Sequence, residues 1–231
     1  MSRLANEVGR SKIFFKKRND YALVIPVINE GDKIRDQLKN IKQNNLSVDV
    51  VIADGGSSDG SLEFNFLEEQ EVRAILIKKD IGKLSSQLRI AYFWALKEGY
   101  HGIITIDGNG KDDVSYISKI KDRLMQGYDY VQGSRYINGG ISRHTPIDRK
   151  IANKLIHAPI ISLATGFKFT DTTNGFRGYS SKFLEDEKVQ PFRNIFINYE
   201  LLFYLSVRAG KLNFRICEVP VSRIYPKVGA T

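Results

Sequence analysis

The sequence predicts an α/β fold with a mostly parallel central sheet flanked by helices. Between about residues 21 and 135, short apolar runs that end at Gly, Asp or Asn alternate with longer amphipathic stretches. This alternation is typical of strand–helix units that feed a parallel sheet. A chain of 231 residues is also long enough to bury one sizeable core. We therefore expect one doubly wound domain.

Hydrophobic runs and capping residues define the elements of this domain. Runs rich in Val, Ile and Leu predict five strands, at residues 21–27, 48–53, 72–77, 102–106 and 128–133. Amphipathic stretches predict four helices, at about 31–44, 58–69, 83–98 and 113–126. The candidate N-caps are Asp32, Ser57 or Ser58, and Asp112 or Asp113.

The pattern is less regular after residue 135. Residues 147–164 predict a helix with a bend at Pro159, because proline cannot donate a helical hydrogen bond. Residues 198–210 predict a second helix that ends at Gly210. Residues 211–224 alternate like a strand, in which Pro220 suits an edge or an end.

Composition favours a soluble or membrane-peripheral protein. No segment approaches the roughly 18 consecutive apolar residues of a spanning helix, and the first twenty residues lack the apolar core of a signal peptide. The single Cys217 excludes an internal disulfide framework. We expect a cytoplasmic protein with a basic N-terminal extension at residues 1–20 and a single domain at residues 21–231.

The formal net charge of +9 favours a polyanionic partner. In "KIFFKKR", residues 12–18, cations flank Phe14 and Phe15 in a way that suits the headgroup layer of an anionic membrane. A solvated N-terminus is the alternative interpretation. The sequence contains no aromatic–basic recognition motif, so we expect no nucleic-acid partner.

Five polar or glycine-bearing loops follow the five predicted strands. They are "NEG", "DGGSSDGS", "DIGK", "DGNG" and "GSRY". In doubly wound sheets, ligands bind at the carboxyl ends of the strands, so these loops are expected to converge on one site. Turn chemistry explains any one of these loops, but it explains the set of five less well.

Asp107 is a candidate metal and diphosphate ligand. A carboxylate at a strand end, followed by small residues, can reach a divalent cation that bridges the two phosphates of a nucleotide-sugar. Asn109 can add a neutral carbonyl oxygen, which predicts weak metal binding. Lys111 either places an ammonium near the same phosphates or points to solvent. Asp54 either accepts hydrogen bonds from a base or ribose, or closes a turn.

Two arginines and two carboxylates complete the candidate site. Arg135 and Arg149 flank a Gly-rich loop and suit bidentate phosphate recognition, although surface arginines are the alternative interpretation. Asp171 and Glu200 have apolar or small neighbours, which indicates partial burial near the site. Either could act as a general base, and pairing of Glu200 with an arginine is the competing structural explanation. The three histidines show no ligand spacing and are assigned no metal.

Taken together, these motifs resemble glycosyltransferase family 2, with its Rossmann-like GT-A fold, and within it the dolichol-phosphate mannose synthase-like branch. The resemblance runs from about residue 21 to residue 228. It rests on "IPVINE", "ADGGSSDGS", "DGNGKDD", "VQGSRY", "DTTNGFRGYS", "NYELL" and "EVPVSRIYP", in the family's order.

The resemblance implies transfer of a sugar, with inversion, from a nucleoside diphosphate sugar, usually with Mg2+ or Mn2+. It assigns the nucleotide to Pro26, Asn29, Glu30, Asp54, Gly82 and Lys83. It further assigns the diphosphate and metal to Asp107, and the acceptor phosphate to Arg135 and Arg149. Asn109 and Lys111 depart from the branch's usual loop, which has a second Asp and a Gln at these places.

The resemblance leaves the acceptor open. One hypothesis is a polyprenyl phosphate at the inner face of the membrane, whose ionised phosphate needs no strong general base. The second is the sugar hydroxyl of a lipid-linked glycan in polysaccharide assembly, which would need Asp171 or Glu200 as the base. The third is a catalytically silent nucleotide-binding scaffold that has lost its metal.

Overall fold

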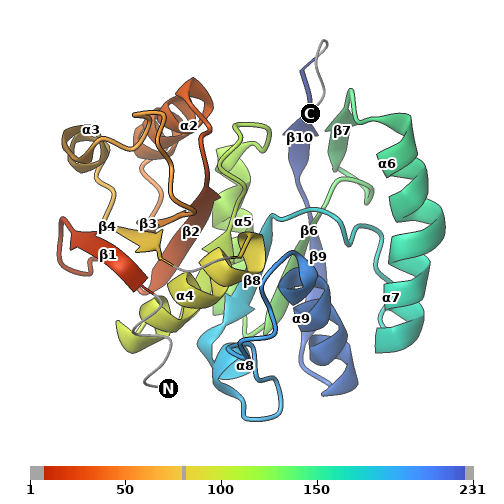
Figure 1. The fold of residues 1–231 in the computed structure, drawn as a ribbon. Helices are drawn as coiled ribbons and strands as arrows, with labels where there is room; N and C mark the ends of the chain where they lie inside the picture. Colours follow the sequence, from red (N-terminus) through yellow and green to blue (C-terminus); the bar gives the residue numbers. More distant parts are fainter. Residues whose placement is uncertain (1–7, 80–81, 227–231) are drawn as a thin grey trace.

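Eight strands form one central sheet in the computed structural model, which describes residues 8–79 and 82–226 (Figure 1). From one edge to the other, the strands are β1 (Val8–Ile13), β4 (Ala74–Lys78), β3 (Asp49–Asp54), β2 (Tyr21–Val27), β5 (Gly102–Thr105), β8 (Arg177–Ser180), β6 (Tyr130–Ser134) and β9 (Ile216–Pro220). The block β4–β3–β2–β5 is parallel throughout, as predicted. Both of its faces are buried, which explains its almost continuous apolar sequence.

The sheet is mixed, however, because β1 and β8 run antiparallel to their neighbours. Neither strand is predicted from the sequence. β1 contains Gly, Arg, Ser and Lys, and it joins the sheet edge through backbone hydrogen bonds to β4, which hydrophobic patterning does not report. β8 is the four-residue segment "RGYS", too short to give a periodic signal.

Helices cover the two faces of the sheet and form two hydrophobic cores. On one face lie α2 (Asp32–Gln43), α3 (Phe64–Glu69) and α5 (Ile117–Met125), packed against Leu23 and Ile25 of β2. On the other face lie α4 (Leu84–Lys97), α8 (Ser181–Glu185) and α9 (Glu200–Lys211), packed against Ala22 and Val24. Successive side chains of β2 therefore enter opposite cores, as a strand's period of two requires.

The predicted helix at 58–69 begins only at α3. Side-chain hydrogen bonds hold the preceding residues in a loop instead. Asp54 accepts hydrogen bonds from Ser57, and Asp59 accepts them from Gly31 and Ser61. Ser57 therefore closes a turn rather than capping a helix. Asp113, by contrast, is the N-cap of the short helix η1 (Val114–Tyr116) and accepts a hydrogen bond from the amide of Ser115.

The C-terminal third adds a two-stranded sheet and a long helical segment. β7 (Ile141–Arg143) pairs in parallel with β10 (Ser222–Ile224). The helical segment runs through α6 (Ile147–Ala152), the π-helical turn η2 (Asn153–His157) and α7 (Ala158–Thr165). Its irregular turn lies directly before Pro159, the predicted bend, where the missing N–H interrupts the α-helical ladder. Within the described residues, no helix has the length and apolarity needed to cross a bilayer.

Candidate active site

The loops after β2 and β3 are joined to each other by side chains. Asn29, at a positive φ of 51°, accepts a hydrogen bond from the amide of Ser58 and donates its own N–H to the Ser57 hydroxyl. That hydroxyl and the Ser57 amide donate to Oδ1 of the buried Asp54, at 2.7 and 2.9 Å. Asp54 thus closes a turn through one oxygen. Its role toward a base remains a prediction.

A cavity of about 470 Å³ opens beside these loops. It is lined by the predicted residues Pro26, Glu30, Gly82, Lys83, Asp107 and Asn109. Its wall includes Gln87, which donates to the carbonyls of Val27 and Ala53 and so joins α4 to two strand ends. Gly82 has a φ of 137°, and a Cβ there would overlap the Ser86 side chain. Glycine is therefore required at that position of the wall.

Asp107 lies between this cavity and a second one. Its carboxylate is 27% exposed, and Oδ2 lies 3.0 Å from the Arg223 guanidinium. Gly175 packs against Oδ1 so closely that a Cβ at this position would overlap it. Gln37 of α2 holds the loop, since it donates to the Asp107 carbonyl and accepts from the Gly110 amide.

The site fits a metal ion only if the substrate shares in holding it. Among the described residues, no three His, Cys, Asp or Glu side chains form a ready-made metal cage. Asp107 offers a partly exposed carboxylate, and the Oδ1 of Asn109 accepts only a long hydrogen bond, 3.3 Å, from the Lys111 amide. One carboxylate and one amide oxygen suit an ion whose other ligands are diphosphate oxygens and water.

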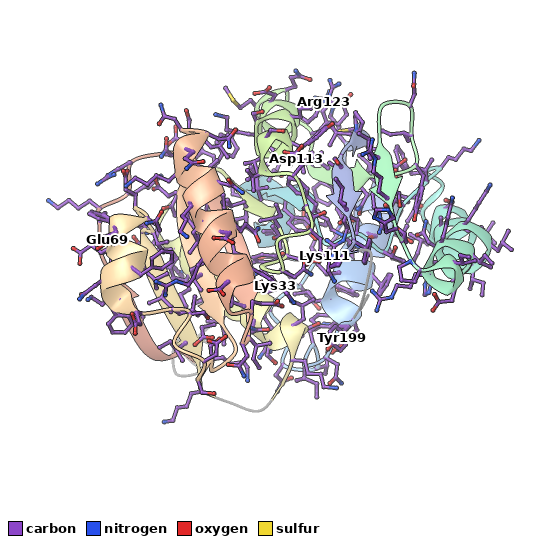
Figure 2. All side chains as sticks on the ribbon, turned by 90° about the horizontal axis from the view of Figure 1, so that it is seen from above. Lys33, Glu69, Lys111, Asp113, Arg123 and Tyr199 are labelled. Atoms are coloured by element: carbon purple, nitrogen blue, oxygen red, sulfur yellow. The ribbon has the colours of Figure 1, made fainter. Side chains whose placement is uncertain are left out.

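Cations surround this loop. The Lys111 ammonium lies 5.0 Å from the ring centre of Tyr225, and burial together with the charge of Arg223 lowers the pKa of Lys111. Lys33, in the first turn of α2, and Lys111 line one further cavity, and both are labelled in the view from above (Figure 2). Lys111 lines the second cavity rather than pointing only to solvent.

Arg223 and Asp112 form a buried ion pair that the sequence analysis does not predict. The Nη1 of Arg223 contacts Asp112, while its Nη2 contacts Asp107. Burial raises the pKa of Asp112, although the Arg223 charge opposes this shift. The pair joins residues 111 positions apart, and β10 brings Arg223 to the loop through the Ile224 amide, which donates to the Lys111 carbonyl.

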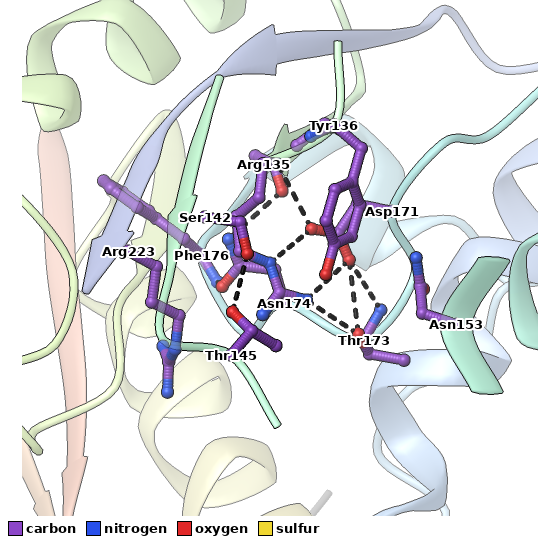
Figure 3. Close-up of polar contacts among 12 residues, drawn as sticks. Arg135, Tyr136, Ser142, Thr145, Asn153, Asp171, Thr173, Asn174, Phe176 and Arg223 are labelled. Atoms are coloured by element: carbon purple, nitrogen blue, oxygen red, sulfur yellow. Dashed lines mark hydrogen bonds and ion pairs between the residues drawn. The ribbon is translucent and has the colours of Figure 1, made fainter. Parts of the chain in front are cut away.

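Arg135 is held in place by Asp171. Its guanidinium donates to both carboxylate oxygens, at 2.7 and 2.9 Å, and also to the Thr173 hydroxyl at 2.8 Å (Figure 3). Asp171 is fully buried, and Arg135 is 5% exposed. Both oxygens of Asp171 are thus committed to Arg135, which suits a residue that positions the arginine better than a general base.

A second cavity, of about 480 Å³, contains both predicted phosphate-binding arginines. Arg135, Arg149, Lys111 and Arg223 line it together with Asp107. Tyr225 lies among these cations, and Nη1 of Arg135 donates to its hydroxyl at 3.4 Å. Burial alone would raise the pKa of Tyr225, but the charges of Arg223 and Arg135 outweigh it and lower the pKa. Because Asp171, Asp112 and Asp107 balance only part of the charge of these cations, the lining keeps a net positive charge and favours an anionic ligand.

Glu200 has a different surrounding. It lies in the first turn of α9, and its carboxylate accepts hydrogen bonds from the amides of Ile197 and Asn198. Burial alone would raise the pKa of Glu200, but the hydrogen bonds from these amides outweigh it and lower the pKa. The Ile197 carbonyl in turn accepts from the Lys83 amide at 2.6 Å. Glu200 therefore orders the segment that includes Tyr199, which lines both cavities, and lines neither cavity itself.

The comparison with known families decides the classification. A family model described as Glycosyl transferase family 2 matches residues 22–187. The chain belongs to this family. It is therefore a glycosyltransferase, and the family resemblance predicted from its motifs is confirmed.

Two relatives and one solved structure illustrate the similarity. The polyprenol monophosphomannose synthase of Mycolicibacterium smegmatis is 24% identical over 90% of this chain and 79% of its own length. A UDP-N-acetylglucosamine–dolichyl-phosphate N-acetylglucosaminyltransferase of Methanococcus voltae is 27% identical over 88% and 85%. The Mycobacterium tuberculosis glucosyl-3-phosphoglycerate synthase, solved with Mn2+, UDP and glucosyl-3-phosphoglycerate, has a TM-score of 0.63 at 14% identity, covering 88% of this chain and 71% of that one. The predicted GT-A fold is thus confirmed.

Proposed function

We propose that this glycosyltransferase moves a sugar from a nucleoside diphosphate sugar, with inversion, to a polyprenyl phosphate. The observation that carries the proposal is the pairing of the preorganised Arg135 with Arg149 in one cavity that also contains Asp107. The Arg149 guanidinium suits a bidentate contact to phosphate, and Arg135, whose Nε and Nη2 donate to Asp171, would contribute through Nη1. The relatives from M. smegmatis and M. voltae are named for polyprenol and dolichyl phosphate chemistry, which is consistent with that ligand.

In this proposal the donor occupies the cavity lined by Pro26, Glu30 and Lys83, with Asn29 and Asp54 behind it. The diphosphate reaches Asp107 and Asn109, where Lys111 and Arg223 supply positive charge. A bound Mg2+ or Mn2+ would neutralise charge on the departing diphosphate. Asp107 and Asn109 would hold that ion with the diphosphate, in keeping with the weak metal binding predicted from Asn109.

The acceptor phosphate lies at Arg135 and Arg149 and attacks the anomeric carbon in line with the departing diphosphate. A new bond forms between a phosphate oxygen and the anomeric carbon, while the bond from that carbon to the diphosphate oxygen breaks. The phosphate oxygen is already ionised near neutral pH, so no strong base is needed. The arginines contribute by orienting the nucleophile and reducing repulsion between two anions.

The positions of the Asp171 and Glu200 carboxylates favour transfer to a phosphate over transfer to a sugar hydroxyl of a lipid-linked glycan. A hydroxyl acceptor needs a base, and the two predicted candidates are engaged elsewhere. Asp171 accepts from Arg135 through both oxygens, and Glu200 accepts backbone hydrogen bonds. Asp171 is fully buried, and Glu200 lines neither cavity, so neither is placed to take a proton from an acceptor hydroxyl.

Peripheral contact with the cytoplasmic face of an anionic membrane would bring the enzyme to such an acceptor. The segment α6–η2–α7 supports this part of the proposal, because large apolar side chains on it are strongly exposed: Ile147, Ile151, Leu155, Ile156, Ile160 and Leu163. Lys150 and Lys154 accompany them, the combination expected of an interfacial helix. In the predicted "KIFFKKR" segment, by contrast, Phe14 packs against the core and Phe15 lies under Arg18.

Substitution of the arginines tests the proposal. Arg149→Ala should reduce transfer of sugar to undecaprenyl phosphate by at least about 100-fold, because it removes a charged contact to the nucleophile. The rise in melting temperature caused by UDP, GDP or dTDP with Mn2+ should remain as in the wild type. Full activity in this variant would contradict the lipid-phosphate assignment. Absence of any nucleotide effect on wild-type melting would favour the silent scaffold.

A further inference from the structure

An apolar groove of about 610 Å³ lies beside the acceptor cavity and takes no part in the reaction described above. Its walls come from the helical segment α6–η2–α7 and from the chain around Phe169. Its volume falls within the range of pockets that bind small organic ligands.

The helical segment separates the groove from the acceptor cavity. Arg149 and Ala152, three residues apart, line the acceptor cavity. Lys150, Lys154 and Ala158, spaced four apart, line the groove. Residues at these spacings share a helix face, so two adjacent faces of one segment look into two different cavities.

The interior of the groove suits an apolar ligand. Ala158 and Phe169 are buried, and Pro159 adds a further apolar wall. The Ser162 hydroxyl is already committed, because it donates to the Ala158 carbonyl at 2.6 Å and accepts from the Phe169 amide at 2.9 Å. The Thr170 hydroxyl similarly donates to Glu218 at 2.8 Å. With these two hydroxyls satisfied internally, the part of the groove around Ala158 and Phe169 offers little to a polar ligand.

Tyr136 joins the groove to the catalytic arginine. It lines both cavities, and its ring centre lies 5.2 Å from the Arg135 guanidinium. Its hydroxyl is buried and has no hydrogen-bond partner among the described residues. A buried hydroxyl without a partner is unusual and is readily satisfied by a ligand oxygen.

We propose that this groove binds the first isoprene units of the lipid acceptor. The inference rests on the proposed function. The chain would leave the phosphate at Arg135 and Arg149, pass Tyr136 and lie along Ala158 and Pro159. Lys150, Lys154 and Lys168 at the groove add positive charge that favours an anionic lipid over a neutral one. The exposed apolar side chains next to the groove continue the same surface toward a bilayer.

Matched phosphates of different chain length test the inference in solution. Geranyl phosphate carries two isoprene units, and methyl phosphate carries none. Binding of each to the wild-type protein is measured by calorimetry in the presence of UDP and Mn2+. The dissociation constant of geranyl phosphate should be at least about tenfold lower, because the groove removes its chain from water.

Pro159→Trp should abolish this advantage by filling the groove from an exposed position, while binding of methyl phosphate stays unchanged. Ile160→Trp is the matched control. Ile160 is the next residue along the helix, and its side chain is also exposed but does not line the groove. This variant should keep the advantage. If Pro159→Trp keeps the wild-type ratio of the two dissociation constants, the inference is overturned. It is also overturned if the wild type binds geranyl phosphate and methyl phosphate equally well.

Photocrosslinking of the wild-type protein gives an independent measurement that needs no variant. A geranyl phosphate with a diazirine on its chain should label peptides within residues 150–170. Labelling confined to other parts of the chain would overturn the inference. Failure of the proposed function gives a different pattern: the chain-length ratio and the labelling remain, but no sugar is transferred to either phosphate.

Discussion

The donor side and the acceptor side of the site are built in different ways. On the donor side, hydrogen bonds from uncharged groups hold the loops at strand ends, as when Ser57 donates to Asp54 and Gln87 donates to the carbonyls of Val27 and Ala53. On the acceptor side, buried ion pairs hold the arginines: Arg135 with Asp171 and Arg223 with Asp112. The first arrangement needs no buried cation, whereas the second places paired charges in the interior of the fold.

Because of this difference, substitutions on the acceptor side are expected to destabilise the fold more than substitutions on the donor side. A buried charge that loses its partner costs several kcal/mol, whereas loss of a turn hydrogen bond costs about 1 kcal/mol. Acceptor-side substitutions should therefore reduce stability as well as activity, and donor-side loop substitutions should act mainly on nucleotide binding.

The largest effect is expected for Asp171→Ala, which leaves Arg135 buried and unpaired. It should lower the free energy of unfolding by about 3 kcal/mol in urea denaturation. Thr173→Val is the control, because it removes one hydroxyl that contacts Arg135 and Asp171 while the ion pair stays, and it should cost about 1 kcal/mol. Equal costs for the two variants would contradict the positioning role of Asp171.

The next effect concerns the membrane face. Ile151→Glu replaces an exposed apolar side chain with an anion and should weaken binding to phosphatidylglycerol vesicles about tenfold in a flotation assay. Met125→Glu is the control, because Met125 is an exposed apolar residue on α5, outside the helical segment. If both variants lose vesicle binding to a similar degree, the added negative charge alone explains the loss, and a specific apolar contact of the α6–η2–α7 segment with the membrane is contradicted.

A smaller effect is expected where the two sides meet, at Asp107. Because the Arg223 guanidinium already neutralises the Asp107 carboxylate, Arg223 should compete with a metal ion for that carboxylate. The double variant Arg223→Met/Asp112→Asn removes the competitor without leaving a buried unpaired carboxylate. It should bind Mn2+ about fivefold more tightly than wild type when nucleotide is absent, measured by electron paramagnetic resonance. Unchanged or weaker Mn2+ binding would show that Arg223 does not occupy the ion's place.

The smallest effect concerns Glu200 and pH. Its lowered pKa means that it stabilises the fold above its ordinary pKa of 4.5, and that this contribution is lost as the pH falls through the lower folded value. Glu200→Gln should therefore be less stable than wild type at pH 7, by less than about 0.5 kcal/mol because the group is exposed. The melting temperatures should converge as the pH falls below the folded pKa of Glu200. A constant difference across this range would contradict the assignment.

The sequence predicts the donor side well for a physical reason. The strands β2, β3 and β5 are buried on both faces, so their apolar runs are unmistakable, and the loops that follow them carry Asp54 and Asp107. The same local rules do not detect β8, or β1 at the sheet edge. They also miss Asp112–Arg223, because an ion pair between residues 111 positions apart leaves no local pattern.

Asp171 illustrates the limit of such reasoning. Its small and apolar neighbours correctly indicate burial, but the sequence cannot show that both of its oxygens face Arg135. The exposure of Leu155 and Leu163 is equally hidden, because an apolar helix stripe is normally buried against a core.

Transfer to undecaprenyl phosphate labelled with 18O in its phosphate group tests the central claim most directly. If a phosphate oxygen is the nucleophile, the product's anomeric carbon is bonded to the labelled oxygen, and the carbon NMR signal shows the corresponding isotope shift. An anomeric carbon bonded to unlabelled oxygen, or a sugar attached to another sugar's hydroxyl, would contradict the account.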